Sequence, residues 1–196
     1  KLMNGSKPSS SLINTISQCY PLHPLVALLL SPLSRQRFGQ NERSIFSFLN
    51  SGEPNGFLHF LKNSNAKKEL YTVDKLFDYL QVNLEPSILV SNIGHVWSTA
   101  TEAIRRAEVT DDSTSIKIAK VITLVDLFGK NLSLFSSKEI LMHALNQEKT
   151  NIENTLSLLE DKKIIIYRKF KKAYSLFSGS DIDLEQVVEL NKSKIS

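Results

Sequence analysis

Cysteine is nearly absent from this sequence of 196 residues, because Cys19 is the only one. No disulfide can form within the chain, and a lone thiol is typical of a reducing compartment such as the cytoplasm. The longest apolar run, Leu25–Leu30, is far shorter than the about 20 residues that span a bilayer. The first residues are polar and rich in serine, unlike a signal peptide. We therefore predict a cytoplasmic protein that makes no contact with a membrane.

Motifs that bind phosphate or metal are also missing. The seven glycines are scattered, and neither a GxxxxGK(S/T) loop nor an acidic pair after an apolar strand is present to hold ATP and Mg²⁺. The histidines lie far apart, and none has metal-ligand spacing to another histidine or to the cysteine. No GxSxG sequence marks a nucleophilic serine. We predict that this chain alone has no catalytic residue, no metal site and no cofactor.

The sequence has only a small excess of positive charge. The chain has 24 Lys and Arg residues against 20 Asp and Glu residues, a net charge of +4. An excess of this size does not by itself predict a nucleic-acid partner. Hydrophobic residues make up 41% of the sequence, which is enough for a buried core, and the length allows one large domain or two small ones.

Helical patterns dominate the first part of the chain. Residues 1–18 are polar and are expected to be a flexible N-terminal segment. Pro24 then stands in the first turn of an apolar helix, and Asn41 is placed to cap the next one. Pro86 is expected to interrupt the chain between two later helices. We assign residues 19–110 to one helical domain.

A different pattern begins after the polar stretch at 108–115. An apolar helix is followed by two capping-box sequences, 136–139 and 150–153, each of which predicts the start of a further helix. Two β-rich runs then flank residues 168–173, which predicts a hairpin with a basic tip, and a last helix follows. Three helices before a hairpin are the order of a winged-helix domain, here at 111–196. The predicted fold is mainly α, an N-terminal helical bundle followed by this winged helix.

The predicted hairpin tip carries four cations: Arg168, Lys169, Lys171 and Lys172. In a DNA-binding wing they would contact phosphates, whereas in a protein-contact or structural wing they would only keep the turn solvated. The helix before the hairpin is expected to expose Asn151, Glu153, Asn154, Ser157, Glu160 and Asp161. Its three carboxylates argue against insertion into a DNA groove. Nucleic-acid contact and protein contact both stay open.

Arg43 is the other candidate ligand-binding cation. It ends the polar elbow FGQNER, 38–43, which joins two apolar helices. An arginine near the start of a buried helix is well suited to reach an anionic ligand such as a phosphate. The simpler alternatives are that Arg43 pairs with Glu42 or Glu53, or that it is exposed to solvent.

The stretches YPLHPLVALLL, 20–30, and FGQNERSIFSFL, 38–49, resemble a part of large bacterial P-loop ATPases of the AAA+/STAND type. The stretch AYSLFSGSDIDLEQ, 173–186, is similar to a later part of the same proteins. In that family the first two segments follow the nucleotide-binding core and begin its helical lid. The resemblance implies that Arg43 is a sensor-like arginine that reaches the phosphates. It also implies that His23 and Pro24 shape the lid helix beside the nucleotide.

The P-loop and the acidic strand of that family are missing from this chain. The resemblance therefore implies a non-catalytic lid and winged-helix module, which regulates a larger protein whose upstream ATPase core binds ATP and Mg²⁺. The polar stretch Lys1–Ser17 would be the place where such a core joins. Two alternatives remain: a free-standing winged-helix DNA-binding protein with an N-terminal helical domain, and an adaptor that binds a protein partner.

Overall fold

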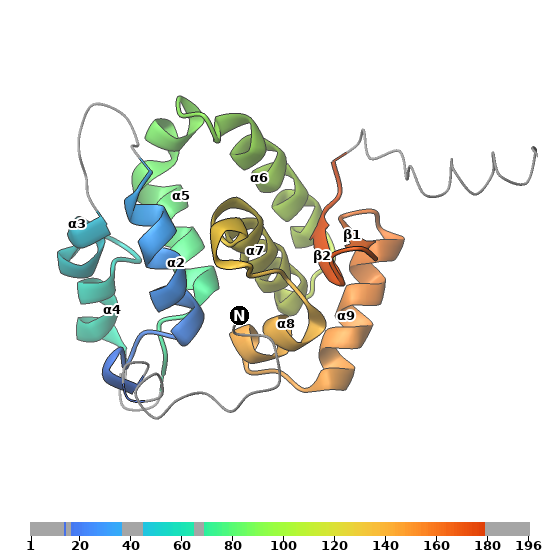
Figure 1. Cartoon of the computed structure of the whole chain (residues 1–196), viewed down its shortest axis with the longest axis horizontal. Coiled ribbons are helices and arrows are strands. Elements are labelled where there is room, and N and C mark those ends of the chain that lie inside the picture. Colours follow the sequence, from blue (N-terminus) through green and yellow to red (C-terminus); the bar gives the residue numbers. More distant parts are fainter. Residues whose placement is uncertain (1–13, 15–16, 37–44, 65–68, 179–196) are drawn as a thin grey trace, which may run out of the picture.

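The structure, a computed structural model, describes residues 14, 17–36, 45–64 and 69–178. In these residues the chain is mainly helical, with one two-stranded antiparallel sheet (Figure 1). The elements in chain order are α2 (Pro24–Ser34), α3 (Ile45–Asn50), α4 (Phe57–Asn63), α5 (Val73–Leu89), α6 (Gly94–Glu108), α7 (Ser113–Phe128), the 3₁₀ turn η1 (Lys130–Leu132), α8 (Lys138–Leu145), α9 (Lys149–Asp161), β1 (Ile165–Arg168) and β2 (Ala173–Leu176).

Helix α7 lies at the centre of the molecule. It contacts α2, α5 and α6 on one side and α8, α9 and β2 on the other. The Asp112 carboxylate caps its first turn by accepting hydrogen bonds from the amides of Thr114 and Ser115. Most of its side chains are buried, as expected for a helix that is apolar on nearly all sides. Its end at Gly129 is tight, because a Cβ there would lie 2.5 Å from the Val125 carbonyl oxygen.

The helices before α7 enclose an aromatic cluster. The Tyr71 ring meets Phe48, Phe57 and Phe60 edge-on, at centroid distances of 5.3 to 5.8 Å. The Tyr71 backbone also pairs with the segment before α2, since its amide donates to the Pro21 carbonyl and its own carbonyl accepts from the His23 amide. These bonds hold the beginning of α2 beside α5.

The hairpin β1–β2 packs against α7 and α9. Tyr167 pairs with Tyr174 in the antiparallel register, and Arg168 pairs with Ala173 across the turn. The Tyr174 amide donates to the Ser136 carbonyl oxygen at 2.9 Å, so the segment before α8 lies along the outer edge of β2. The prediction of a hairpin flanking 168–173 is thus confirmed.

Two local predictions are wrong. Pro86 lies inside α5, which continues to Leu89. The carbonyl four residues before it belongs to Val82, whose side chain is 59% exposed, so water can replace the missing helical hydrogen bond. Thr150 lies within α9, which begins one residue earlier and has Glu148 as its N-cap. The helix start predicted at 136–139 is confirmed, but the N-cap is Ser137, which accepts from the Ile140 amide, so the predicted pairing of Ser136 with Glu139 as a capping box is not formed.

The hydrophobic core is continuous across the predicted domain boundary. One buried cluster runs from Leu25 in α2 through α7 to Tyr174 in β2. The division into 19–110 and 111–196 stays a prediction about folding units. The cap at Asn41 and the helix expected after residue 179 lie outside the described residues. No helix among the described residues has the length and apolar character needed to cross a membrane.

Candidate functional site

The residues predicted to form sites fall into two groups. His23 and Pro24 lie at the start of α2, and the four cations Arg168, Lys169, Lys171 and Lys172 lie on the hairpin. Arg43 lies outside the described residues. Pro24 is the first residue of α2, as its missing N–H predicts.

His23 joins α2 to α8 through both of its ring nitrogens. Nδ1 accepts a hydrogen bond from the Leu25 amide at 3.2 Å and so caps α2. Because Nδ1 accepts, the ring proton belongs on Nε2, which lies 3.2 Å from the His143 carbonyl oxygen in the last turn of α8. Burial lowers the pKa of His23, although the hydrogen bond to His143 and the charge of Asp74 oppose the shift. The neutral imidazole is therefore the form that this junction requires.

A groove lies between the hairpin and the first turns of α8 and α9. Its volume is about 1120 Å³. Four lysines line it: Lys138, Lys149, Lys171 and Lys172. The hairpin adds two aromatic rings, Tyr167 and Tyr174, whose centroids are 5.1 Å apart. We call this surface, together with the turn at 169–172, the hairpin groove.

The carboxylates of α9 are less available than the sequence predicts. Glu153 is half-buried and accepts from Lys138 Nζ at 2.8 Å, and this bond lowers its pKa. Glu160 is also half-buried, and it accepts a hydrogen bond from the Tyr167 amide at 3.2 Å. Burial raises the pKa of Glu160. Two of the three carboxylates expected to repel DNA are thus hydrogen-bonded, but the Glu153 side chain is still 37% exposed and Asp161 is exposed, so they continue to oppose insertion of α9 into a DNA groove.

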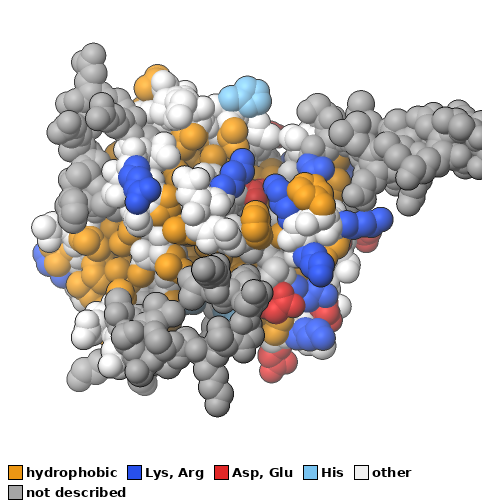
Figure 2. Space-filling model, viewed as in Figure 1, with side chains coloured by type: hydrophobic (Ala, Val, Ile, Leu, Met, Phe, Trp, Pro, Cys, Tyr) orange, Lys and Arg blue, Asp and Glu red, His pale blue; other side chains and the backbone are white. Residues whose placement is uncertain are grey.

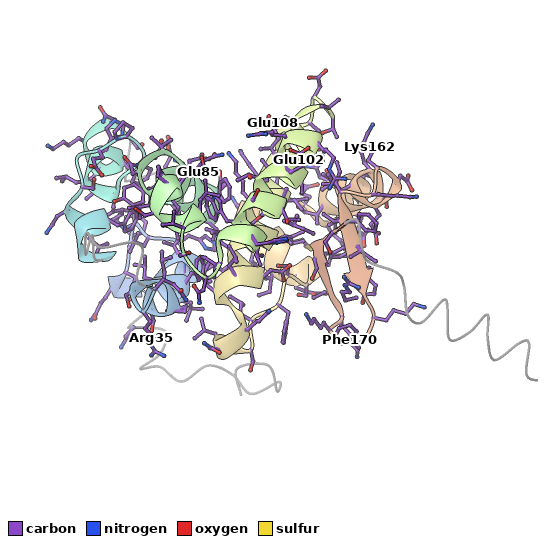
Figure 3. All side chains as sticks on the ribbon, turned by 90° about the horizontal axis from the view of Figure 1, so that it is seen from above. Arg35, Glu85, Glu102, Glu108, Lys162 and Phe170 are labelled. Atoms are coloured by element: carbon purple, nitrogen blue, oxygen red, sulfur yellow. The ribbon has the colours of Figure 1, made fainter. Side chains whose placement is uncertain are left out.

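Sequence reasoning missed Phe170 at the hairpin tip. Its side chain is 74% exposed and projects from the turn, away from the helices (Figure 3). Lys171 Nζ lies 5.4 Å from the ring centroid. On the face drawn in Figure 2, Lys and Arg side chains gather over the hairpin and α9. The signal was present in the sequence, because an aromatic residue in the middle of a basic turn has no core to enter.

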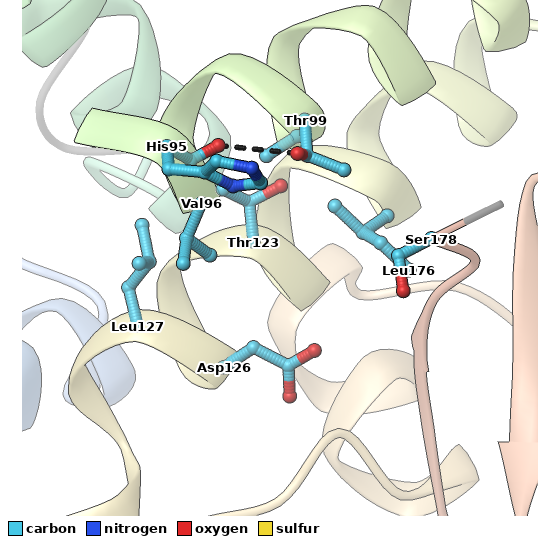
Figure 4. A pocket seen from close by; sticks show the side chains of 9 residues that line it. His95, Val96, Thr99, Thr123, Asp126, Leu127, Leu176 and Ser178 are labelled. Atoms are coloured by element: carbon cyan, nitrogen blue, oxygen red, sulfur yellow. Dashed lines mark hydrogen bonds between the residues drawn. The ribbon is translucent and has the colours of Figure 1, made fainter. Parts of the chain in front are cut away.

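A smaller cavity of about 310 Å³ lies between α6, α7 and the end of β2 (Figure 4). Asp126 is its titratable residue on α7, and burial raises the pKa of this carboxyl against a hydrogen bond from Ser175. The hydroxyls of Thr99 and Thr123 are used in bonds to the carbonyls of His95 and Ala119 within their own helices. The cavity thus contains one buried carboxyl, with His95 and Ser178 also in its lining.

Among the residues that the structure describes, no group of three or more His, Cys, Asp or Glu side chains could hold a metal ion. Comparison with protein-family models, with curated proteins and with solved structures gives no match to this chain.

Proposed function

We propose that this chain is a non-catalytic regulatory module of a larger ATP-binding protein. In this proposal its N-terminal helices form the lid over a nucleotide-binding core, and α7, α8, α9 and the hairpin form a winged-helix unit that contacts a partner. The lid would change conformation when the nucleotide binds or is hydrolysed. The winged-helix unit would move with the lid, and its contact with the partner would change.

The observation that carries the proposal is the junction at His23. The resemblance implies that this residue lies beside the nucleotide, and its ring also contacts the last turn of α8 through the His143 carbonyl. Helix α7 adds a second connection, since it packs against α2, α5 and α6 as well as α8, α9 and β2. A shift of α2 would therefore be passed to the hairpin through packed elements.

The winged-helix part of the proposal is supported by the order of the elements after Asp112. Three helices precede a hairpin, and the Tyr174–Ser136 hydrogen bond places the segment before α8 beside β2. A winged-helix sheet has a third, short edge strand at this position, where the described segment makes this one backbone hydrogen bond and the sheet itself has two strands. The likeness is one of architecture and says nothing by itself about the partner.

Coupling would follow from nucleotide contact. If Arg43 touches the γ-phosphate, the lid closes when ATP is bound and relaxes after hydrolysis. The hairpin groove would then move with α2 and α7, because these elements share one core. ATP would thereby control when the groove meets its partner.

The first test is the reading frame upstream of Lys1. A GxxxxGK(S/T) sequence within about 300 residues is expected, a distance that allows for one or two domains. In the complete protein, Arg43→Ala should lower ATP hydrolysis about 100- to 1000-fold, the usual effect of removing one hydrogen-bond donor to the transition state. Arg35→Ala removes an exposed arginine at the end of α2 and should leave hydrolysis unchanged. An upstream frame without a P-loop, or full hydrolysis in the Arg43 variant, would overturn the proposal.

A further inference from the structure

We propose that the hairpin groove binds single-stranded nucleic acid, with Phe170 and Tyr167 stacking on bases and the groove lysines contacting phosphates. This inference goes beyond the regulatory role and does not depend on it. A chain that binds oligonucleotides but has no ATPase core upstream would keep this inference and lose the proposed function.

The positive excess of the chain falls in the segment that contains this groove, although Lys162 lies at the end of α9 remote from the hairpin turn (Figure 3). Residues 129–178 contain nine Lys and Arg residues and five Asp and Glu residues, an excess of four positive charges. The net charge of the whole chain is also +4, so the rest of the sequence is balanced. A polyanion would thus be attracted to one end of the molecule.

The two groove carboxylates, Glu139 and Glu153, offset two of the four groove lysines and leave the lining with a net positive charge. Glu153 is ion-paired with Lys138, and Lys149 Nζ lies 4.0 Å from it. Glu139 accepts from the Ser137 hydroxyl at 2.8 Å at the start of α8. Lys171 and Lys172 line the opposite side of the groove, on the hairpin, and Lys169 is exposed in the turn beside them. A phosphate backbone that lies along the hairpin side of the groove would therefore contact these three lysines.

The exposed aromatic rings of the hairpin favour a single-stranded nucleic acid as the ligand over other anions. Phe170 is 74% exposed and Tyr167 is 41% exposed, and both are on the hairpin with the lysines. Apolar rings in a basic groove are the combination that binds unpaired bases, because every base offers a face for stacking. A regular duplex keeps its base faces inside the helix and offers only edges and phosphates. The rings therefore favour a single strand over a duplex.

An anionic membrane surface would also attract lysines and an exposed phenylalanine. The geometry favours nucleic acid, because Tyr167 and the groove lysines line a concave surface between the hairpin, α8 and α9 rather than the flat face of an amphipathic helix. A single strand can follow this hollow, whereas a bilayer would reach only the projecting tip.

The experiment is fluorescence anisotropy of the whole chain with a labelled oligothymidylate of about 16 nucleotides. Binding is expected, with an affinity that falls as salt rises from about 50 to 200 mM. Phe170→Ala should weaken binding about 5- to 100-fold, the usual effect of removing one stacking partner of a base. The double variant Lys171→Gln, Lys172→Gln should lower the slope of log affinity against log salt by about 1.4, because each neutralised phosphate of a single strand adds about 0.7 to that slope.

Two matched substitutions serve as controls. Val90→Ala removes an apolar side chain that is 80% exposed elsewhere, and Lys62→Gln removes an exposed lysine on α4. Neither should change the affinity, and the fluorescence of the single tryptophan should report native folding in all variants. The proposal is overturned by absence of oligothymidylate binding, by equal effects of hairpin and control variants, by tighter binding of a duplex of the same length, or by tighter binding of phosphatidylserine vesicles.

Discussion

The hydroxyl of Thr155 donates a hydrogen bond to the carboxylate of Asp112 across 3.3 Å, although 43 positions separate the two residues. The same carboxylate accepts from the amides of Thr114 and Ser115 and from the Ser115 hydroxyl. One side chain thus caps the central helix α7 and anchors α9 to it. The hairpin groove depends on this anchor, because α9 forms one of its walls.

Substitution of Asp112 should therefore destabilise the protein more than removal of a surface charge. Asp112→Ala is expected to lower the free energy of unfolding by about 1–2 kcal/mol, the usual range for an N-cap. Glu108→Ala, at an exposed position just before this turn, should change it by less than about 0.5 kcal/mol. Urea denaturation followed by tryptophan fluorescence measures both. Equal stability of the two variants would contradict the capping role.

The same carboxylate should produce an acid dependence. Burial opposes the shift, but the hydrogen bonds from Thr114, Ser115 and Thr155 together lower the pKa of Asp112 below its ordinary value of 3.8. Its contribution is thus complete above pH 3.8 and is lost as the pH falls through the lowered folded-state pKa. Asp112→Asn should show a smaller loss of stability in this acid range, measured by denaturation at a series of pH values. If the variant lost as much stability at acid pH as the unmodified protein does, Asp112 would not be a source of the acid dependence.

His23 should give a second pH dependence, nearer neutrality. Its pKa is lowered from 6.5, mainly by burial, so the unfolded chain takes up its proton before the folded one. The stability contributed by the neutral ring is therefore complete above pH 6.5 and falls as the pH drops toward the lowered folded-state pKa. The charged or titratable groups that face it are Asp74 and His143.

His23→Asn tests this without removing the cap, because asparagine is a good N-cap residue. The variant should lose part of the stability change between about pH 7.5 and 5 that the unmodified protein shows. His95→Asn, at an exposed position on α6, is the matched control and should keep the full change. Identical profiles for the two variants would show that His23 does not titrate as the geometry requires.

Asp126 should behave in the opposite way. Burial raises its pKa above 3.8, so its ionisation at neutral pH costs stability, although Ser175, Lys171 and Lys130 reduce the cost. Asp126→Asn is expected to raise the thermal transition temperature at pH 7 and to have a smaller effect near pH 4, where the wild-type carboxyl is more protonated. Asp161→Asn, at an exposed position, should leave the transition unchanged at both pH values. A lower transition temperature for Asp126→Asn at pH 7 would contradict this account of the cavity.

Trp97 should be the most sensitive core position. Its ring is fully buried, stacks on Phe77 at a centroid distance of 4.9 Å, and donates from Nε1 to Glu85 at 2.9 Å. Trp97→Ala should cost about 3–5 kcal/mol of unfolding free energy, whereas Trp97→Phe keeps the stack and should cost about 1–2 kcal/mol. Circular dichroism during thermal denaturation measures both variants, with Val96→Ala as an exposed control on the same helix. If Trp97→Phe were as unstable as Trp97→Ala, stacking of this ring on Phe77 would not contribute to stability.

Local sequence patterns predicted the elements well where one residue type decides the backbone. Pro24 begins α2, and β-rich runs around residues 168–173 form the hairpin. Prediction failed at Pro86, because its local preference for ending a helix was outweighed by the core contacts that continue α5 to Ile88. The error at Thr150 is a shift of two positions, since α9 has Glu148 as its N-cap and Thr150 is its second residue.

The candidate site shows the same division between sequence and structure. By itself, the sequence determined the kinds of residue available: a basic turn with one aromatic residue, a histidine before Pro24, and no GxxxxGK(S/T) loop. Only the tertiary structure decided that Glu153 and Glu160 are engaged, that His23 meets the end of α8, and that Phe170 projects outward. The physical reason is that backbone propensities act over a few neighbouring residues, whereas burial and side-chain pairing depend on which distant segments the core brings together.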